Sequence, residues 1–257
     1  MDYNYHTHTT RCGHAFGSDE EYILCAIEAG IKHLGFSDHA PFIFPDGFEH
    51  RYRIPMSEGR NYISDLTVLR EKYKDKIEIS IGLEMEYYPN YFSQMINTAR
   101  NLGAEYLILG QHFIMSEHSR GIGAGGPTDN AEHLKAYVDE VIEAIKTGVF
   151  TYVAHPDIMC FTGDDSIYKK EIERLCLASR ELDIPLEINL AGVRYNKFYP
   201  ADRFWEIAGS VGAPVTIGYD AHNATDMLNK EQLCFAERLI STHKLNYIGI
   251  PKLRPIL

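Results

Sequence analysis

The sequence predicts an α/β fold in which parallel strands form a barrel and helices cover its outside. Two observations support this prediction. Strand-like apolar segments alternate with helix-like segments about seven times along the chain, which is typical of a parallel sheet. Nearly every strand-like segment also ends in a polar residue that can bind a metal ion. A barrel brings all of these ends to one face, whereas an open sheet would spread them across its width.

The strand-like segments are short runs of apolar and β-branched residues. In chain order they cover residues 2–8, 34–37, 77–83, 106–110, 150–154, 185–190, 214–218 and 247–250. Most of these runs are apolar almost without interruption, which is the pattern of a strand that is buried on both faces. We therefore expect parallel strands with helices packed on them.

The segments between the strands have the apolar spacing of amphipathic helices. The first is marked at both ends, because Ser18 can cap its N-terminus and Gly30 stands where a C-cap is expected. Between these two residues, Ile23, Ala26 and Ile27 recur at helical spacing. The predicted helices cover residues 19–29, 57–73, 91–101, 130–147, 166–182, 201–211 and 226–243.

The composition is that of an ordinary soluble globular protein. The chain of 257 residues is 45% hydrophobic and 24% charged, and residues 1–257 fit the size of a single large α/β domain. The formal net charge of −11 disfavours long nucleic acids as partners, although it does not exclude a mononucleotide. The sequence does not indicate an oligomeric state.

The cysteines and the N-terminus indicate a cytoplasmic protein. The five cysteines are scattered and form no C-x-x-C pair, which argues against a disulfide framework or a zinc ribbon: Cys12, Cys25, Cys160, Cys176 and Cys234. The N-terminus lacks the basic and apolar regions of a signal peptide. No stretch approaches the roughly 18 apolar residues of a membrane span, so we expect no membrane partner.

Nine residues at or near the predicted strand ends are candidate metal ligands: His6, His8, His14, His39, Glu84, His112, His155, Asp220 and His222. A single histidine at such a place can be held by hydrogen bonds alone, but seven buried imidazoles without a metal ion would be costly. Histidines mixed with a few carboxylates suit zinc, manganese or iron better than calcium or magnesium. Nine ligands exceed the four of one tetrahedral site, so two or three ions are predicted. Such a site suits in-line displacement at phosphorus.

The order and spacing of these residues resemble the polymerase-and-histidinol-phosphatase (PHP) family. The resemblance extends from residue 6 to residue 222 and rests on His6-Thr7-His8, His14, Ser37-Asp38-His39, Gly82-Leu83-Glu84, Gln111-His112, His155-Pro156 and Asp220-Ala221-His222. Membership of this family would imply a distorted (β/α)7, TIM-like barrel with three metal ions at the C-terminal ends of its strands.

The resemblance also implies three ligand sets. They are His6, His8, Glu84 and Asp220 for the first metal; Glu84, His112 and His155 for the second; and His14, His39 and His222 for the third. A hydroxide between the first two metals would attack phosphorus in line. Asp38 is either an outer carboxylate that orients a ligand or a plain turn residue.

Within the family, a stand-alone chain of this length is most similar to the histidinol-phosphate phosphatases of histidine biosynthesis. That similarity implies a phosphomonoester hydrolase with a small phosphorylated substrate. Residues 187–194 resemble a segment whose arginine grips the phosphate, and the guanidinium of Arg194 suits that role. We also predict His14 and His39 at the substrate site. The proton for the leaving group would come from Asp220, from His222 or from a water molecule on a metal.

One departure weakens the choice of substrate. Family members can carry a second phosphate-binding arginine five residues after the histidine equivalent to His155, and here that position is Cys160. Four other arginines are candidates to replace it: Arg11, Arg51, Arg53 and Arg120. A PHP-type phosphodiesterase, a nucleotide phosphatase and a metal-binding domain without catalysis are the alternative functions.

Overall fold

The computed structural model describes residues 1–118 and 121–256, so Arg120 lies outside the described residues. The strands are β1 (Tyr3–Asn4), β2 (His33–Phe36), β3 (Glu78–Ile81), β4 (Leu83–Met85), β5 (Leu107–Leu109), β6 (Phe113–Ile114), β7 (Ile122–Gly123), β8 (Phe150–Val153), β9 (Leu186–Asn189), β10 (Pro214–Gly218) and β11 (Asn246–Tyr247). Three of them form a sheet in the order β1-β2-β3, and six form a second sheet in the order β11-β10-β9-β8-β5-β4. Every pair in these two sheets is parallel, as predicted.

The helices are α1 (Asp19–Ala29), α2 (Gly59–Tyr73), α3 (Phe92–Leu102), α4 (Ala131–Lys146), α5 (Asp165–Leu182), α6 (Leu190–Arg194), α7 (Asp202–Val211) and α8 (Lys230–His243). Three short 3-10 helices are η1 (Thr10–Cys12), η2 (Met56–Glu58) and η3 (Ala224–Leu228). The predicted caps of α1 are confirmed, because Ser18 forms a capping box with Glu21 and Gly30 has a left-handed φ of 81°. Within the described part of the chain, no helix is long and apolar enough to cross a membrane.

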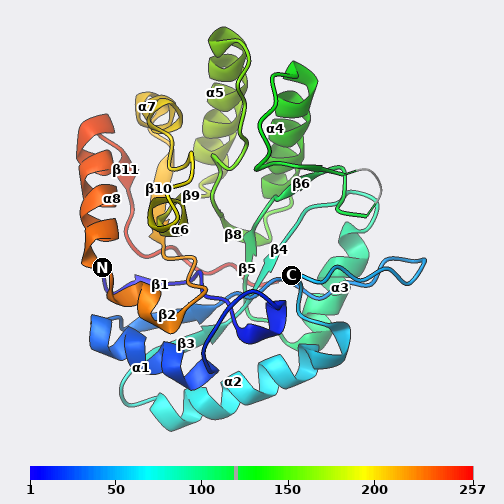
Figure 1. Cartoon of the computed structure of the whole chain (residues 1–257), viewed down its shortest axis with the longest axis vertical. Helices are drawn as coiled ribbons and strands as arrows, with labels where there is room; N and C mark the ends of the chain where they lie inside the picture. Colours follow the sequence, from blue (N-terminus) through cyan, green and yellow to red (C-terminus); the bar gives the residue numbers. More distant parts are fainter. Residues whose placement is uncertain (119–120, 257) are drawn as a thin grey trace.

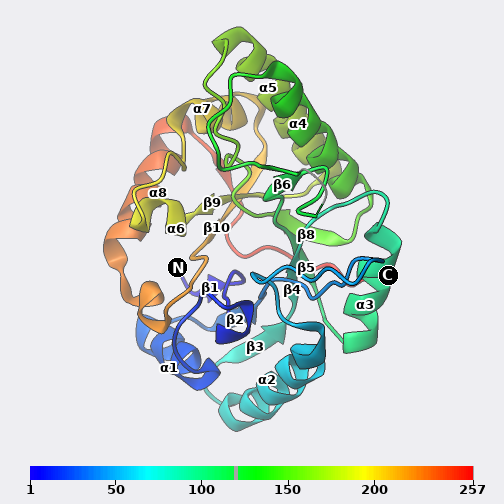
Figure 2. The same cartoon turned by 45° about the vertical axis from the view of Figure 1, so that its right-hand side comes forward.

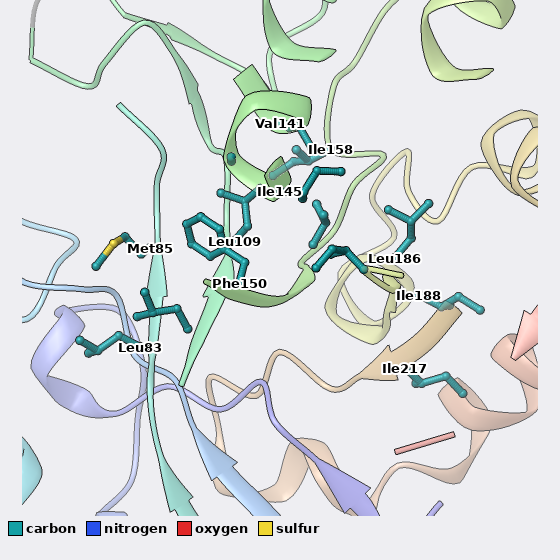
Figure 3. Close-up of a cluster of buried hydrophobic side chains, with 14 of the residues drawn as sticks. Leu83, Met85, Leu109, Val141, Ile145, Phe150, Ile158, Leu186, Ile188 and Ile217 are labelled. Atoms are coloured by element: carbon teal, nitrogen blue, oxygen red, sulfur yellow. The ribbon is translucent and has the colours of Figure 1, made fainter. Parts of the chain in front are cut away.

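The helices lie outside the parallel strands (Figures 1 and 2). Side chains from β4, β5, β8, β9, β10 and α4 meet in a buried cluster (Figure 3): Leu83, Met85, Leu109, Phe150, Leu186, Ile188, Ile217, Val141 and Ile145. These side chains are at most 4% exposed, and full burial of one such side chain stabilises the fold by about 1.5–3 kcal/mol. The cluster therefore stabilises the strands whose ends carry the predicted ligands.

The first strand is shorter than predicted. The segment 2–8 is extended as β1 only at Tyr3 and Asn4, because the Asn4 side chain then takes over the backbone hydrogen bonds. Its Nδ2 donates to the carbonyl of His6, and its Oδ1 accepts from the amide of the same residue. Beyond this point, Thr7 forms a parallel bridge with Ala221, which follows β10. His6 and His8 therefore leave the strand and lie against the segment after β10.

The predicted strand 77–83 is divided at Gly82 into β3 and β4. The first part pairs with β2 and the second with β5, so the chain passes from one sheet to the other at this glycine. A Cβ atom at Gly82 would lie 2.5 Å from ring carbons of Tyr106, which leaves no space for a side chain. Two further differences are the hairpin β6–β7 and the helix α6, neither of which the sequence pattern indicated.

Candidate metal centre

All nine predicted ligands come together at the carboxyl ends of the parallel strands. Eight of them line a cavity of about 520 Å³. The ninth, His6, is 0% exposed and lies 3.6 Å or less from Glu84 and Asp220. These side chains come from segments that follow β1, β2, β5, β8 and β10 and from β4 itself. The geometry thus gathers residues from both ends of the sequence in one place.

Glu84 lies in the middle of this cluster. One or other of its carboxylate oxygens lies 2.9–3.6 Å from a ring nitrogen of five histidines: His6, His8, His39, His112 and His155. The side chain of Glu84 is only 1% exposed. A carboxylate in this position has two oxygens for two different cations, which is the arrangement that a shared ligand requires.

Asp220 and His222 form the second part of the cluster. Oδ1 of Asp220 lies 3.5 Å from Nε2 of His6 and 3.1 Å from Nε2 of His8. Nε2 of His222 lies 3.0 Å from Nε2 of His14, a separation at which the two ring nitrogens share either a proton or a cation. The ring of His222 also stacks on that of His8, with centroids 4.0 Å apart.

Several of these buried polar atoms have no hydrogen-bond partner: Nε2 of His6, Nε2 of His8, Oε2 of Glu84, Nδ1 of His155 and Oδ1 of Asp220. Leaving a buried polar atom unpaired costs about 1–3 kcal/mol, so five together in one place require a compensating partner. Imidazole nitrogens and carboxylate oxygens are suitable donors for zinc, manganese and iron. The donor set therefore fits divalent metal ions.

Ligand atoms within 4.8 Å of one another fall into five groups: His6, His8 and Glu84; His6, His155 and Asp220; His39, Glu84 and His112; His14, His39 and His222; and His8, Cys12 and His222. The fourth has the same residues as the third predicted set, and the first has three of the four residues of the first predicted set, without Asp220. The third places His39 with Glu84 and His112, whereas the resemblance had assigned His155 to that set. Cys12 was not among the predicted ligands.

The two carboxylates are ionised at neutral pH. Burial alone would raise the pKa of Glu84, but the imidazoles of His112, His39 and His6 lower it well below its usual range. The same balance lowers the pKa of Asp220, for which His6 is the strongest favourable partner. Both side chains therefore present negative charge to the cavity without first losing a proton.

Three histidines, His6, His8 and His112, have a raised pKa and hold protons that a metal ion would replace. Burial lowers the pKa of His6, but the carboxylates of Glu187, Asp220 and Glu84 more than offset this and raise it to about 10. The pKa of His112 is raised to about 9, again against the effect of burial and mainly by Glu84. Because a metal ion binds the neutral imidazole, metal affinity falls as the pH falls below these values.

A buried carboxylate behind His6 fixes the orientation of its ring. The two oxygens of Glu187, in β9, lie 2.9 and 3.1 Å from Nδ1 of His6. The same carboxylate accepts hydrogen bonds from the amide of His155 at 3.0 Å and from the side chain of Asn189 at 2.8 Å. This leaves Nε2 of His6 facing Glu84. The sequence carried a signal for this role, namely a charged residue inside an apolar strand.

Two more carboxylates act in the same way on other rings. Glu86 lies 2.8 Å from Nδ1 of His112 and also accepts from its amide. Asp38 lies 3.3 Å from Nδ1 of His8 and is 0% exposed, which agrees with the outer carboxylate rather than the turn residue. Glu86 was missed, although its position two residues after Glu84 in an extended segment was a signal.

Gly110 gives Glu84 the space that it occupies. A Cβ atom at Gly110 would lie 2.0 Å from Oε1 of Glu84, so Gly110→Ala must displace the carboxylate. We expect Gly110→Ala to lose bound metal and about 1–3 kcal/mol of stability, as measured by metal content after dialysis and by urea unfolding. Gly125→Ala is the control, because no atom lies within 4 Å of its Cβ position. A full metal complement in Gly110→Ala would contradict the proposed position of Glu84.

The rest of the cavity wall is largely aromatic: His50, Tyr52, Phe113, Tyr195 and Tyr199. Among the described residues, Arg53 is the only lysine or arginine that lines the cavity. Its guanidinium forms two hydrogen bonds of 2.6 and 2.7 Å with Glu117 and a third of 2.9 Å with the carbonyl of Ala40. The charge of Arg53 is therefore balanced by the carboxylate of Glu117, which also lines the cavity.

Arg194 ends α6 and contacts the segment that follows β10. It is not among the residues that line the cavity, and its guanidinium donates to the carbonyl oxygens of Tyr219 and Asp220. It also forms an ion pair of 3.2 Å with Asp226. Nε of Arg194 is buried and has no hydrogen-bond partner, so the contact between Arg194 and a phosphate stays a prediction.

The other predicted cationic residues are mostly engaged elsewhere. Arg11 pairs with Asp19 and Asp65, and Arg51 lies over the ring of Tyr52. Neither arginine lines the cavity. Of the four candidates to replace the second phosphate-binding arginine, only Arg53 is in the wall, and Arg120 is outside the described residues.

One protein-family model matches most of the chain. The PHP domain matches residues 4–191. A probable histidinol-phosphatase of Deinococcus radiodurans is 26% identical over 234 residues, which cover 84% of this chain and 85% of that protein. The histidinol-phosphatase of Bacillus subtilis is 25% identical over 256 residues, with 86% and 94% coverage.

The fold is shared with a solved structure. Histidinol phosphate phosphatase from Lactococcus lactis, in complex with zinc, L-histidinol and phosphate, superimposes with a TM-score of 0.72. The alignment covers 99% of this chain and 97% of that protein at 18% sequence identity. At this identity the likeness establishes the fold.

Proposed function

The chain belongs to the PHP domain family, and we propose that it is a metal-dependent phosphomonoester hydrolase whose substrate is L-histidinol phosphate. The observation that supports this most strongly is the position of Glu84, within 3.6 Å of five imidazoles. The relatives from Deinococcus radiodurans and Bacillus subtilis support the substrate, because each is named histidinol-phosphatase or probable histidinol-phosphatase and matches more than four fifths of the chain. A zinc-bound structure of the same fold supports the metal.

Two or three divalent ions, of zinc, manganese or iron, would be held by His6, His8, His14, His39, Glu84, His112, His155, Asp220 and His222. When bound, such ions stabilise the charge of a phosphate ester and lower the pKa of water. The residues of the chain keep the ligands in place. Glu187, Glu86 and Asp38 orient three imidazole rings, those of His6, His112 and His8, through their Nδ1 atoms. The direction of each Nε2 atom is therefore fixed before a substrate enters.

The aromatic part of the cavity wall would receive the organic part of the substrate. Tyr52, Phe113 and Tyr199 supply apolar surface for an organic leaving group. Asp220 and His222 both line the cavity and, with a water molecule on a metal, are the candidates for the group that protonates the leaving alkoxide. The lowered pKa of Asp220 makes it a poor general acid.

We further propose that residues 1–257 form one domain with a closed (β/α)7, TIM-like barrel. Seven parallel positions follow one another as β1, β2, β3 with β4, β5, β8, β9 and β10. The bridge between Thr7 and Ala221 joins the segment after β1 to the segment after β10. Two backbone hydrogen bonds support it, from His8 to the carbonyl of Ala221 and from Ala221 to the carbonyl of His6.

The substrate is tested with a panel of phosphate esters. We expect the protein, loaded with zinc, manganese or iron, to hydrolyse L-histidinol phosphate with a kcat/KM at least about tenfold above that of nucleoside monophosphates, a difference of about 1.4 kcal/mol. Phosphate release is the measurement, and metal-free protein is the control. Fastest turnover of a phosphodiester would contradict the substrate. Tight metal binding without turnover of any ester would favour a non-catalytic domain.

A further inference from the structure

Asp157 is a buried carboxylate that lies two residues after His155. It is 3% exposed. Its Oδ2 accepts two hydrogen bonds, from the amide of Ala201 at 2.7 Å and from Nε1 of Trp205 at 3.0 Å. Its Oδ1 is buried and has no hydrogen-bond partner. Both donors belong to the start of α7, so the side chain of Asp157 ties that helix to the segment after β8.

The start of α7 has no cap of its own. The residue before the helix is Ala201, whose side chain forms no capping hydrogen bond. Asp157 supplies an acceptor for the amide of Ala201 from 44 residues away in the chain. A negative charge is favourable near the N-terminus of a helix, and hydrogen bonds to a carboxylate are stronger than those to a neutral acceptor. Asp157 is therefore a strong anchor for α7.

The chain from α6 to α7, drawn in yellow in Figure 1, contributes to the cavity wall. Tyr199 lines the cavity, and the centroid of its ring lies 6.4 Å from that of His155. This part of the chain is fixed at two places. At its beginning, Oδ1 of Asn189 accepts from two amides of α6, at 3.0 and 3.2 Å. At its end, Asp157 holds the amide two residues after Tyr199. The position of Tyr199 therefore depends on Asp157.

We propose that Asp157 is a positioning residue that holds the ring of Tyr199 in the cavity wall, and that this ring selects phosphate esters whose organic part carries a planar ring. A planar ring can stack on the aromatic face of Tyr199, and the imidazole of L-histidinol is of this kind. The inference rests on the proposed function, because it takes the cavity as the substrate site. Asp157 acts through the backbone of Ala201, and the phosphate group is bound elsewhere.

The KM values of two esters test this role in the metal-loaded protein. Tyr199→Ala should raise the KM of L-histidinol phosphate by about tenfold, a loss of about 1.4 kcal/mol, and Asp157→Ala by about three- to tenfold, with kcat little changed because only binding is lost. The KM of ethanolamine phosphate, which has no ring, and the inhibition constant of inorganic phosphate should each change less than about twofold. The double variant should bind no worse than Tyr199→Ala, because both changes act through one ring.

Trp205 supplies a readout that needs no substrate. It is the one tryptophan of the chain and is 0% exposed, so quenching of its fluorescence by acrylamide reports whether α7 stays anchored. Asp157→Ala should raise the quenching constant at least about twofold, because the first turn of α7 can then open locally. Asp157→Asn keeps an acceptor oxygen for both donors and should restore both the quenching and the KM of the unaltered protein.

Asp164→Ala is the matched control. Asp164 also accepts from the first amides of a helix, those of Ser166 and Ile167 in α5, but it is exposed and does not line the cavity. It should change neither the KM of either ester nor the quenching of Trp205. Circular dichroism checks the folding of each variant. Where Asp157→Ala does not fold, Asp157→Ser should give a smaller change in the same direction.

Two results would overturn this role. One is an unchanged KM of L-histidinol phosphate in a folded Asp157 variant whose hydrogen bonds to α7 are lost. The other is an equal rise in the KM of both esters, which would show that Asp157 acts on the metal centre through His155 and not on the ring of Tyr199. Failure of the proposed substrate is a separate result, because the unaltered protein would then hydrolyse L-histidinol phosphate no better than ethanolamine phosphate.

Discussion

Glu84→Gln is expected to release most of the bound metal and to reduce kcat/KM by at least about 10²–10³-fold, the loss found when one electrostatic stabiliser is removed from an active site. Glutamine has nearly the same shape, so the change removes mainly the negative charge. That charge faces five imidazoles at 2.9–3.6 Å. An amide cannot offset the charge of two cations, and its NH₂ group would face ring nitrogens that a metal requires.

The measurements are the number of metal ions per chain after dialysis and the rate of phosphate release. Glu78→Gln is the control, since Glu78 also lies 3.0 Å from a histidine, His33, but at an exposed edge where its side chain is 68% exposed. Glu84→Gln protein that keeps both its metal and its rate would remove Glu84 from the centre, and the proposed ligand sets with it.

The fold could be predicted from the sequence to the extent that it depends on local pattern. The seven predicted helices form because apolar spacing and end signals such as Ser18 and Gly30 act within a few residues. The parallel strands were visible because strands buried on both faces are apolar throughout. The division of one strand at Gly82 was not visible, because it depends on the ring of Tyr106, which packs against that glycine in the fold.

The candidate ligands could be predicted for a related reason. Parallel strands bring their carboxyl ends together whatever lies between them, so residues such as Glu84 and Asp220 need only to follow a strand to meet. Their pairing into ligand groups is less predictable. His39 lies nearer to Glu84 than the family resemblance implied, and Cys12 lies near His8 and His222.

The direction of a long side chain was beyond the sequence. Arg194 has the right chemistry for a phosphate, and so do Arg11 and Arg53. Which of them faces the cavity depends on partners far away in the chain, such as the carbonyl of Asp220 for Arg194 and the carboxylate of Glu117 for Arg53. A guanidinium binds carbonyls, carboxylates and phosphates alike, so its residue type does not identify its partner.

Glu187→Ala is expected to have the second largest effect, on both stability and metal binding. Glu187 is 0% exposed, and its removal leaves two buried donors without an acceptor, the ring of His6 and the amide of His155. It also takes from Nδ2 of Asn189 one of its two acceptors, the other being Asp220. Each unpaired donor costs about 1–3 kcal/mol, so the variant should lose several kcal/mol of unfolding free energy. Metal affinity should fall by about 10–100-fold, because the ring of His6 is then free to turn.

Urea unfolding of the metal-free protein and chelator competition separate these two effects. Glu187→Gln keeps the side-chain volume and one acceptor oxygen, so it should lose less stability than Glu187→Ala but still weaken metal binding. Gly218→Ala should displace the same carboxylate, since its Cβ atom would lie 1.8 Å from Oε1 of Glu187. If Glu187→Ala unfolds like the unaltered protein and binds metal as tightly, the ring of His6 is held by other means, and the carboxylate behind it has no part in the centre.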